Sequence, residues 1–177
     1  LKSRWAYSEA KAIEEILAYT YFREKGLPTV IVRLFNTVGP RQVGHYGMVI
    51  PRFVNQALRG QALTVYGDGT QTRCFVDVGD VVPALEQLIH TDGAFGNVFN
   101  LGSTNEVSIG DLAVRIIELS GSTSEVRMVP YDEAYEEGFE DMARRVPDTA
   151  RINQLIGWTP QTSLDDIIRR VVEEQRS

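Results

Sequence analysis

Tyr7-Ser8-Glu9-Ala10-Lys11 lies near the start of the chain, inside a stretch with few helix breakers. Apolar residues recur after it at helical spacing, which predicts one helix over about residues 6–25. Side chains four positions apart lie above one another on a helix, so Tyr7 and Lys11 are expected to point the same way. A positive charge beside a phenol favours the phenolate, which can hold a proton-transfer group ready near neutral pH. The pair is therefore a candidate acid/base centre, and the plain alternative is a surface Tyr and a surface Lys on an amphipathic helix.

A buried strand is expected directly after that helix. Gly26 and Pro28 end the helix, and the β-branched run at residues 29–35 (TVIVRLF) predicts a strand that is buried on both faces. A helix followed by such a strand is half of a doubly wound α/β unit. Asn36 then lies at the carboxyl end of the strand, where ligands bind in open α/β sheets.

The remaining sequence continues to alternate short helices and strands. Periodicity and capping residues predict helices over residues 48–58, 78–89, 108–120, 149–156 and 164–174. Short β-branched runs predict strands over residues 63–66, 72–76, 98–101 and 126–129. Residues 131–145 are acidic and then basic with few apolar positions, so we expect a long loop there.

Composition excludes several classes of protein. The 177 residues are 43% hydrophobic, enough for one globular unit with a sizeable core. The net charge of −6 argues against a dedicated nucleic-acid binder. The single Cys74 excludes an internal disulfide and fits a reducing cytoplasm, and neither His45 nor His90 has a partner at metal-ligand spacing, so we expect no metal site. No apolar run is long enough to span a membrane, and we expect a cytoplasmic protein.

Six short motifs follow one another in a fixed order. They are YSEAK (7–11), VRLFNTVGPR (32–41), VYGDG (65–69), TR (72–73), VGDVV (78–82) and LIGWTP (155–160). The first resembles the Tyr-x-x-x-Lys signature of the short-chain dehydrogenase/reductase superfamily. The set, over essentially the whole chain, resembles the extended branch of that superfamily, the NAD-dependent nucleotide-sugar epimerases, dehydratases and decarboxylases.

The resemblance implies a catalytic and cofactor role for four residues. Tyr7 would be the catalytic acid/base, and Lys11 would hold the nicotinamide ribose of NAD. Leu34 and Phe35 would flank the nicotinamide. A phenolate within hydrogen-bond distance of a sugar hydroxyl suits this chemistry, because the hydroxyl proton must leave together with the hydride.

The resemblance also implies a set of substrate-binding residues, which are Asn36, Val49, Thr64, Tyr66, Arg73 and Asp141. Asn36 would donate to the substrate diphosphate, or else only stabilise the turn. Arg73 would bind the diphosphate through two hydrogen bonds from its guanidinium group, or else be a surface arginine. Thr64 and Tyr66 would hold the base through backbone groups, with the Tyr66 ring available for stacking.

The expected Asp141 site is incomplete. Asp141 would bind phosphate or ribose, or else belong to a solvated charge cluster. The arginine that accompanies this aspartate in relatives falls on Gly138 here, which leaves Arg144 or Arg145 as candidate replacements.

The implied fold is α/β, the C-terminal part of a Rossmann-type doubly wound parallel sheet plus a small α/β substrate-binding lobe. Residues 1–40 would belong to the NAD-binding region, and residues 41–177 mainly to the lobe, with segments returning to the sheet. The glycine-rich phosphate turn and the catalytic Ser or Thr of the family are not among these residues. We therefore expect a C-terminal portion of a longer protein that is inactive by itself.

The first expectation for the function is an NAD-dependent UDP-sugar 4-epimerase acting through a 4-keto intermediate. The alternatives are a UDP-glucuronate decarboxylase or an NDP-sugar 4,6-dehydratase. A nucleotide-sugar binding module without activity is the alternative from another class. Relatives pair the helix that carries the Tyr-x-x-x-Lys motif, which predicts a homodimer through residues 7–23.

Overall fold

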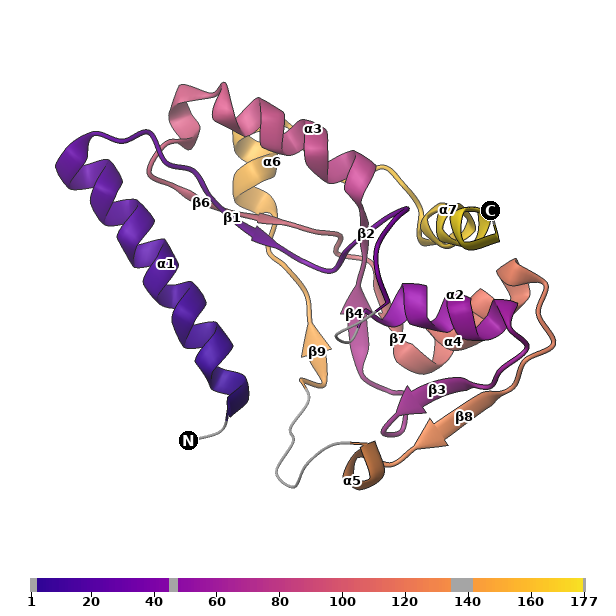
Figure 1. Cartoon of the computed structure of the whole chain (residues 1–177). Helices are drawn as coiled ribbons and strands as arrows, with labels where there is room; N and C mark the ends of the chain where they lie inside the picture. Colours follow the sequence, from indigo (N-terminus) through magenta and orange to yellow (C-terminus); the bar gives the residue numbers. More distant parts are fainter. Residues whose placement is uncertain (1–2, 45–47, 135–141, 177) are drawn as a thin grey trace.

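Helices and short strands alternate in the computed structural model, which describes residues 3–44, 48–134 and 142–176 (Figure 1). The expected helices are found as α1 (Ser3–Lys25), α2 (Val49–Leu58), α3 (Val78–Ile89), α4 (Ile109–Ser120), α6 (Ala150–Ile156) and α7 (Leu164–Arg176). The expected Asp141 site and His45 lie outside the described residues. Within the described ranges, no helix is both long and apolar enough to cross a bilayer.

Local sequence fixes the helix ends. Gly26 adopts a φ of +66° and donates its N–H to the carbonyl of Phe22, which ends α1 as expected. The Ser108 Oγ accepts from the N–H of Asp111 at 2.9 Å at the start of α4, and Gly121 ends that helix with a φ of +62°. Both features follow from residue types that were readable in the sequence.

The strand after α1 is β1 (Ile31–Leu34), which pairs in parallel with β6 (Val98–Leu101). Helices α3 and α6 share one buried cluster with this pair, while α1 runs along its other side (Figure 1). Parallel strands with helices on both faces are the predicted doubly wound arrangement, so this part of the expected α/β fold is confirmed.

The prediction that β1 is buried on both faces is wrong. Ile31 is buried, but Arg33 is exposed and Leu34 is 49% exposed. In the part of the chain that the structure describes, β6 is the strand that pairs with β1, and the carboxyl end of β1 borders an open hollow beside α1. A β-branched run reports strand propensity, whereas burial also depends on what lies against each face.

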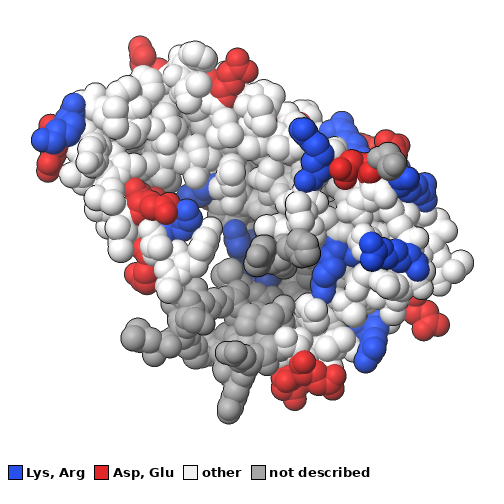
Figure 2. All heavy atoms as spheres, viewed as in Figure 1, with Lys and Arg blue, Asp and Glu red and all other residues white. Residues whose placement is uncertain are grey.

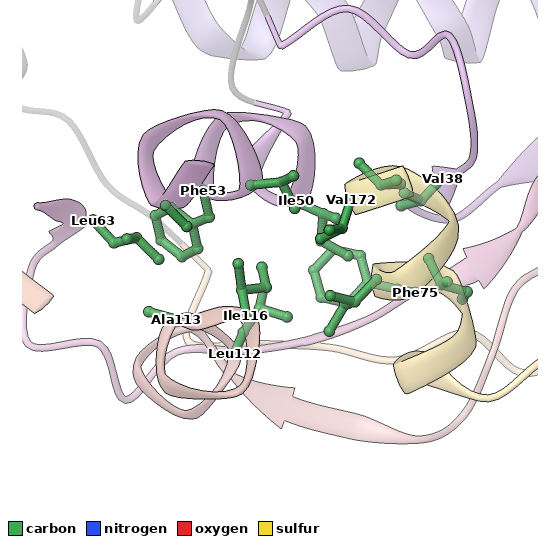
Figure 3. Packing of buried hydrophobic residues seen from close by; sticks show 14 of the residues in the cluster. Val38, Ile50, Phe53, Leu63, Phe75, Leu112, Ala113, Ile116 and Val172 are labelled. Carbon is green, nitrogen blue, oxygen red and sulfur yellow. The ribbon is translucent and has the colours of Figure 1, made fainter. Parts of the chain in front are cut away.

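A second buried cluster, called the lobe core below, is formed mainly by α2, α4, α7 and the strands beside them. Strand β3 (Leu63–Tyr66) pairs in parallel with β8 (Val126–Val129). Helices α2 and α4 pack against β3, and α7 packs against these two helices. Figure 3 shows side chains from these three helices meeting in one cluster. Its fully buried members include Phe53, Leu63, Leu112, Ile116 and Ile168.

Several short elements were missed or misjudged from sequence. The expected strand 72–76 divides into β4 (Thr72–Cys74) and β5 (Val76–Asp77), and β5 pairs with β2 (Thr37–Val38). The expected loop 131–145 contains the one-turn α5 (Tyr131–Ala134) and β9 (Arg144–Arg145). Strand β7 (Glu106–Ser108) and the 3₁₀ turn η1 (Asp92–Ala94) were not predicted. Two- and three-residue strands depend on partners far away in sequence, so they leave no periodic signal.

Helix α1 keeps an apolar surface. Ile13, Ile16 and Leu17 are each more than half exposed. This is compatible with the expected helix pairing between two copies, and the homodimer stays a prediction.

Replacing Ile116 by Ala should destabilise the fold strongly, because its side chain is fully buried in the lobe core. The expected loss is about 2–5 kcal/mol of unfolding free energy. The matched control is Ile89→Ala, since Ile89 is a helical isoleucine that is 59% exposed, and it should change stability by about 0.5 kcal/mol or less. Urea unfolding of both variants measures the difference, and equal losses would contradict this account of the core.

Candidate functional site

A hollow of about 1080 Å³ lies between α1 and β1. Tyr7 and Lys11 line it from α1, Leu34 and Phe35 from the end of β1, and Arg145 from β9. Basic side chains are visible in this hollow in Figure 2. The four residues expected to bind or act beside a nicotinamide therefore share one cavity.

Tyr7 and Lys11 point into the hollow together. The Lys11 Nζ lies 5.7 Å from the centroid of the Tyr7 ring, and Tyr7 is 72% exposed. Lys11 also donates to the Glu14 Oε2 at 2.8 Å. This hydrogen bond and the charge of Glu14 raise the pKa of Lys11, so its ammonium is charged at neutral pH. The i, i+4 spacing thus produces the predicted neighbours, and their chemical roles remain predictions.

Asn36 lies at the turn after β1, with a φ of +35°. Its Nδ2 donates to the carbonyl of Cys74 at 2.7 Å, which ties the end of β1 to β4. This contact fits the turn-stabilising alternative, since asparagine tolerates positive φ better than most residues. An amide nitrogen has two hydrogens and this bond uses one, so a substrate contact is compatible with it.

Arg73 and Arg145 are neighbours on paired strands. Strand β4 pairs with β9 in parallel, with Arg73 opposite Arg145, so both side chains start from the same face of the small sheet. The Arg73 Nη1 donates to the carbonyls of Thr72 and Met142 at 2.7 and 2.8 Å. The guanidinium carbon of Arg145 lies 5.1 Å from the centroid of the Phe35 ring. The two arginines therefore extend from one face of the small sheet, and Arg145 is the one that lines the hollow.

The opposite face of the same sheet holds β9 in place. Arg144 forms a forked ion pair with Glu106 of β7, with an Nη2–Oε1 distance of 2.7 Å, and Thr72 donates to the same carboxylate. These contacts lower the pKa of Glu106, mainly through the Arg144 hydrogen bonds. Arg144 is thus engaged away from the hollow, whereas Arg145 lines it. From the sequence, either arginine was a candidate for the site. The alternation of side chains along β9 turns Arg144 toward Glu106 and Arg145 toward the hollow.

The outer edge of β3 carries the expected base-binding residues. The Thr64 N–H donates to the Gln56 Oε1 at 3.2 Å, and the Thr64 carbonyl accepts from the Arg52 Nη2 at 3.1 Å. The guanidinium carbon of Arg52 lies 4.6 Å from the Tyr66 ring centroid. Arg52 and Gln56 were not predicted as site residues, although their i, i+4 spacing on α2 indicates a shared face.

Val49 is the first residue of α2, and its side chain packs against the lobe core. The helix has no side-chain cap at Met48. The backbone N–H groups of the first turn are therefore the part of this segment suited to an anionic ligand.

The family model of GDP-mannose 4,6-dehydratases matches residues 1–171 of this chain. The chain belongs to this family. The resemblance to the NAD-dependent nucleotide-sugar epimerases and dehydratases is thereby confirmed.

Two similar curated proteins are both named as decarboxylases. The chain is 39% identical over 173 residues to a UDP-N-acetyl-alpha-D-glucosaminuronate decarboxylase of Bacillus cytotoxicus, covering 97% of this chain and 53% of that protein. It is 35% identical to UDP-glucuronic acid decarboxylase 1 of Danio rerio, covering 96% of this chain and 39% of that protein. The chain thus spans about half or less of the length of these curated relatives.

Solved structures of the family confirm the Rossmann-type fold class. A UDP-glucose 4-epimerase of Thermotoga maritima with UDP-glucose superposes with a TM-score of 0.86 at 29% identity, over 96% of this chain and 53% of that one. A dTDP-glucose 4,6-dehydratase of Bacillus anthracis in complex with NAD gives a TM-score of 0.83 at 27% identity, over 96% of this chain and 51% of that one.

The described part of this family member contains no cluster of three or more His, Cys, Asp or Glu side chains suited to a metal ion. The candidate functional side chains of the hollow and the adjoining small sheet are those of Tyr7, Lys11, Arg73 and Arg145.

Proposed function

We propose that this chain carries the acid/base pair and the nucleotide-sugar site of an NAD-dependent UDP-uronate decarboxylase. The observation that carries the proposal is that Arg145 lines the same hollow as Tyr7 and Lys11. A uronate has one more carboxylate than a neutral sugar, and a guanidinium group binds a carboxylate through a planar fork. The two decarboxylases named among the relatives support the same choice.

The hollow fits a nicotinamide cofactor. Val30, Val32, Leu34 and Phe35 give it an apolar wall suited to a flat ring, and Lys11 offers N–H donors to ribose hydroxyls. NAD supplies the hydride acceptor when bound. Residues Tyr7, Lys11, Leu34 and Phe35 would hold it.

Four residues of the chain would each have a separate role in this reaction. Arg73 would bind the diphosphate, and Arg145 the sugar carboxylate. Tyr7 would accept the proton of the C4 hydroxyl as that carbon is oxidised, and Lys11 would favour the negative phenolate by its charge. A carboxylate β to the resulting C4 ketone can leave as carbon dioxide, and the electron pair of the broken C5–C6 bond then forms an enolate, which would take a proton from water at C5. Tyr7 would return its own proton to the C4 oxygen when the ketone is reduced.

A 4-epimerase is the second candidate. The superposition on a UDP-glucose 4-epimerase favours it, and that reaction uses the same Tyr7 and Lys11 without needing a carboxylate contact. Product analysis separates the two reactions in the active enzyme that contains this chain. A decarboxylase converts UDP-glucuronate into a UDP-pentose, whereas an epimerase returns a uronate of unchanged mass.

Arg145→Met should remove the preference for a uronate. Calorimetric titration of the chain with UDP-glucuronate and UDP-glucose is expected to show weaker uronate binding by roughly ten- to a hundredfold, because a hydrogen bond to a charged group contributes about 1.5–3 kcal/mol. UDP-glucose affinity should change little. Arg144→Met is the matched control, since it removes the same charge from the neighbouring residue on the other face of β9. Equal losses for both sugars, or for both variants, would refute the carboxylate contact.

A further inference from the structure

The edge of β3 that faces away from β8 is already occupied by side chains of α2. Leu63 and Gly67 use their N–H groups to bond β8, so Thr64 between them faces the other way. Its N–H donates to the Gln56 Oε1, and its carbonyl accepts from the Arg52 Nη2. Its hydroxyl accepts from both the Arg52 Nη1 and the Gln56 Nε2, at 3.1 and 3.0 Å. Every polar group of Thr64 is thus engaged by Arg52 or Gln56.

Arg52 makes the two contacts that a nucleobase would make at this edge. Its guanidinium group is planar and lies over the Tyr66 ring, with the central carbon 4.6 Å from the ring centroid. It also directs an N–H into the Thr64 carbonyl at 3.1 Å. A base stacked on Tyr66 with an N–H toward Thr64 would need the same space.

We propose that Arg52 is a gate of the nucleobase subsite, which it occupies when no nucleotide is bound and leaves when the base enters. This proposal rests on the proposed function, which assigns Thr64 and Tyr66 to the base. The occupant would be the uracil of a UDP-sugar, whose imide edge places an N–H donor between two carbonyl acceptors. The N–H of this edge would replace the Arg52 donor at the Thr64 carbonyl. One of its carbonyl groups would replace the Gln56 acceptor at the Thr64 N–H.

The closed position of Arg52 is incompletely satisfied. Its Nε is buried and finds no acceptor among the described residues. A buried donor without a partner carries a desolvation cost, which lowers the cost of moving the side chain away. A cavity of about 350 Å³, lined by Arg52, Asn55, Arg59 and Gln175, lies beside the same face of α2 and offers room for the displaced group.

Arg52→Met tests the gate, because it keeps an unbranched apolar stem beside Phe53 and removes the donors and the planar head. Calorimetry of the chain with UDP is expected to show about two- to tenfold tighter binding than in the unmodified chain, the range of one displaced hydrogen bond. Inorganic pyrophosphate, which lacks the base, should show no such gain. Arg169→Met is the matched control, because it also replaces an arginine by methionine, and Arg169 is an exposed residue of α7 that pairs with Asp166 and lines neither the hollow nor this cavity.

Each result of these titrations either supports or contradicts the proposed gate. Tighter UDP binding in Arg52→Met alone supports the gate, including the case in which only that variant binds. Weaker binding of both UDP and pyrophosphate would make Arg52 a phosphate ligand and overturn the gate. UDP binding equal to that of Arg169→Met would mean that Arg52 only holds α2 against β3, with the nucleotide function intact. If no variant binds UDP although circular dichroism shows each to be folded, the proposed function fails and the gate with it.

Discussion

Replacing Tyr7 by Phe is expected to lower turnover by about 10²–10⁴-fold while leaving nucleotide-sugar affinity nearly unchanged. The change deletes one oxygen and keeps the ring that lies near Lys11 and lines the hollow. Without the phenol, no group at that position accepts the proton of the sugar hydroxyl. Steady-state kinetics of the active enzyme that contains this chain should show the loss in kcat rather than in KM.

Tyr21→Phe provides the matched control for this result. Tyr21 lies on the same helix and is 53% exposed, but it does not line the hollow. Its loss should leave kcat unchanged. A Tyr7→Phe variant that keeps kcat and loses affinity would make Tyr7 a binding or packing residue and would remove the basis of the proposed chemistry.

The long elements of this fold were predictable because each is encoded locally. Periodicity, a serine cap and a glycine at positive φ suffice to locate α4, and the same kinds of signal locate α1 and α7. The burial of β1 was not predictable in this way. Leu34 looks like a core residue by type, yet it is half exposed because the neighbours of β1 are a matter of tertiary structure.

In the candidate site, too, some residues could be predicted from local sequence and others required the tertiary structure. Tyr7, Lys11 and Arg73 could be chosen from motifs, because spacing on one helix or a position after a turn is visible in the sequence. The choice between Arg144 and Arg145 required β9, whose alternation turns one residue to Glu106 and the other to the hollow. The contacts of Arg52 could not be predicted from the sequence for a similar reason, because its partners on β3 become neighbours only after α2 packs against that strand. The choice between epimerase and decarboxylase stays a prediction, because the proposed roles of Tyr7 and Lys11 would serve both reactions.

Arg73→Ala is expected to weaken UDP binding by roughly ten- to a hundredfold, because a charge-assisted hydrogen bond contributes about 1.5–3 kcal/mol. Arg73 stands beside Arg145 on paired strands, so it presents a second guanidinium group near the hollow. Arg73→Lys should recover only part of the affinity, since an ammonium cannot form the planar fork. UMP should be less affected than UDP if the outer phosphate makes the main contact. Calorimetric titration of the chain with both nucleotides measures these differences.

Arg73 also donates to the Met142 carbonyl, so its removal loosens the start of β9 as well as the phosphate contact. Arg144→Ala separates the two effects, because it releases β9 from Glu106 without removing a group from the Arg73 face of the sheet. A phosphate ligand predicts that Arg73→Ala lowers UDP affinity far more than Arg144→Ala, with a larger ratio for UDP than for UMP. Equal affinities in Arg73→Ala and the unmodified chain would assign Arg73 to holding β9. The diphosphate would then have to be bound by the first turn of α2, where the backbone N–H groups lack a side-chain cap.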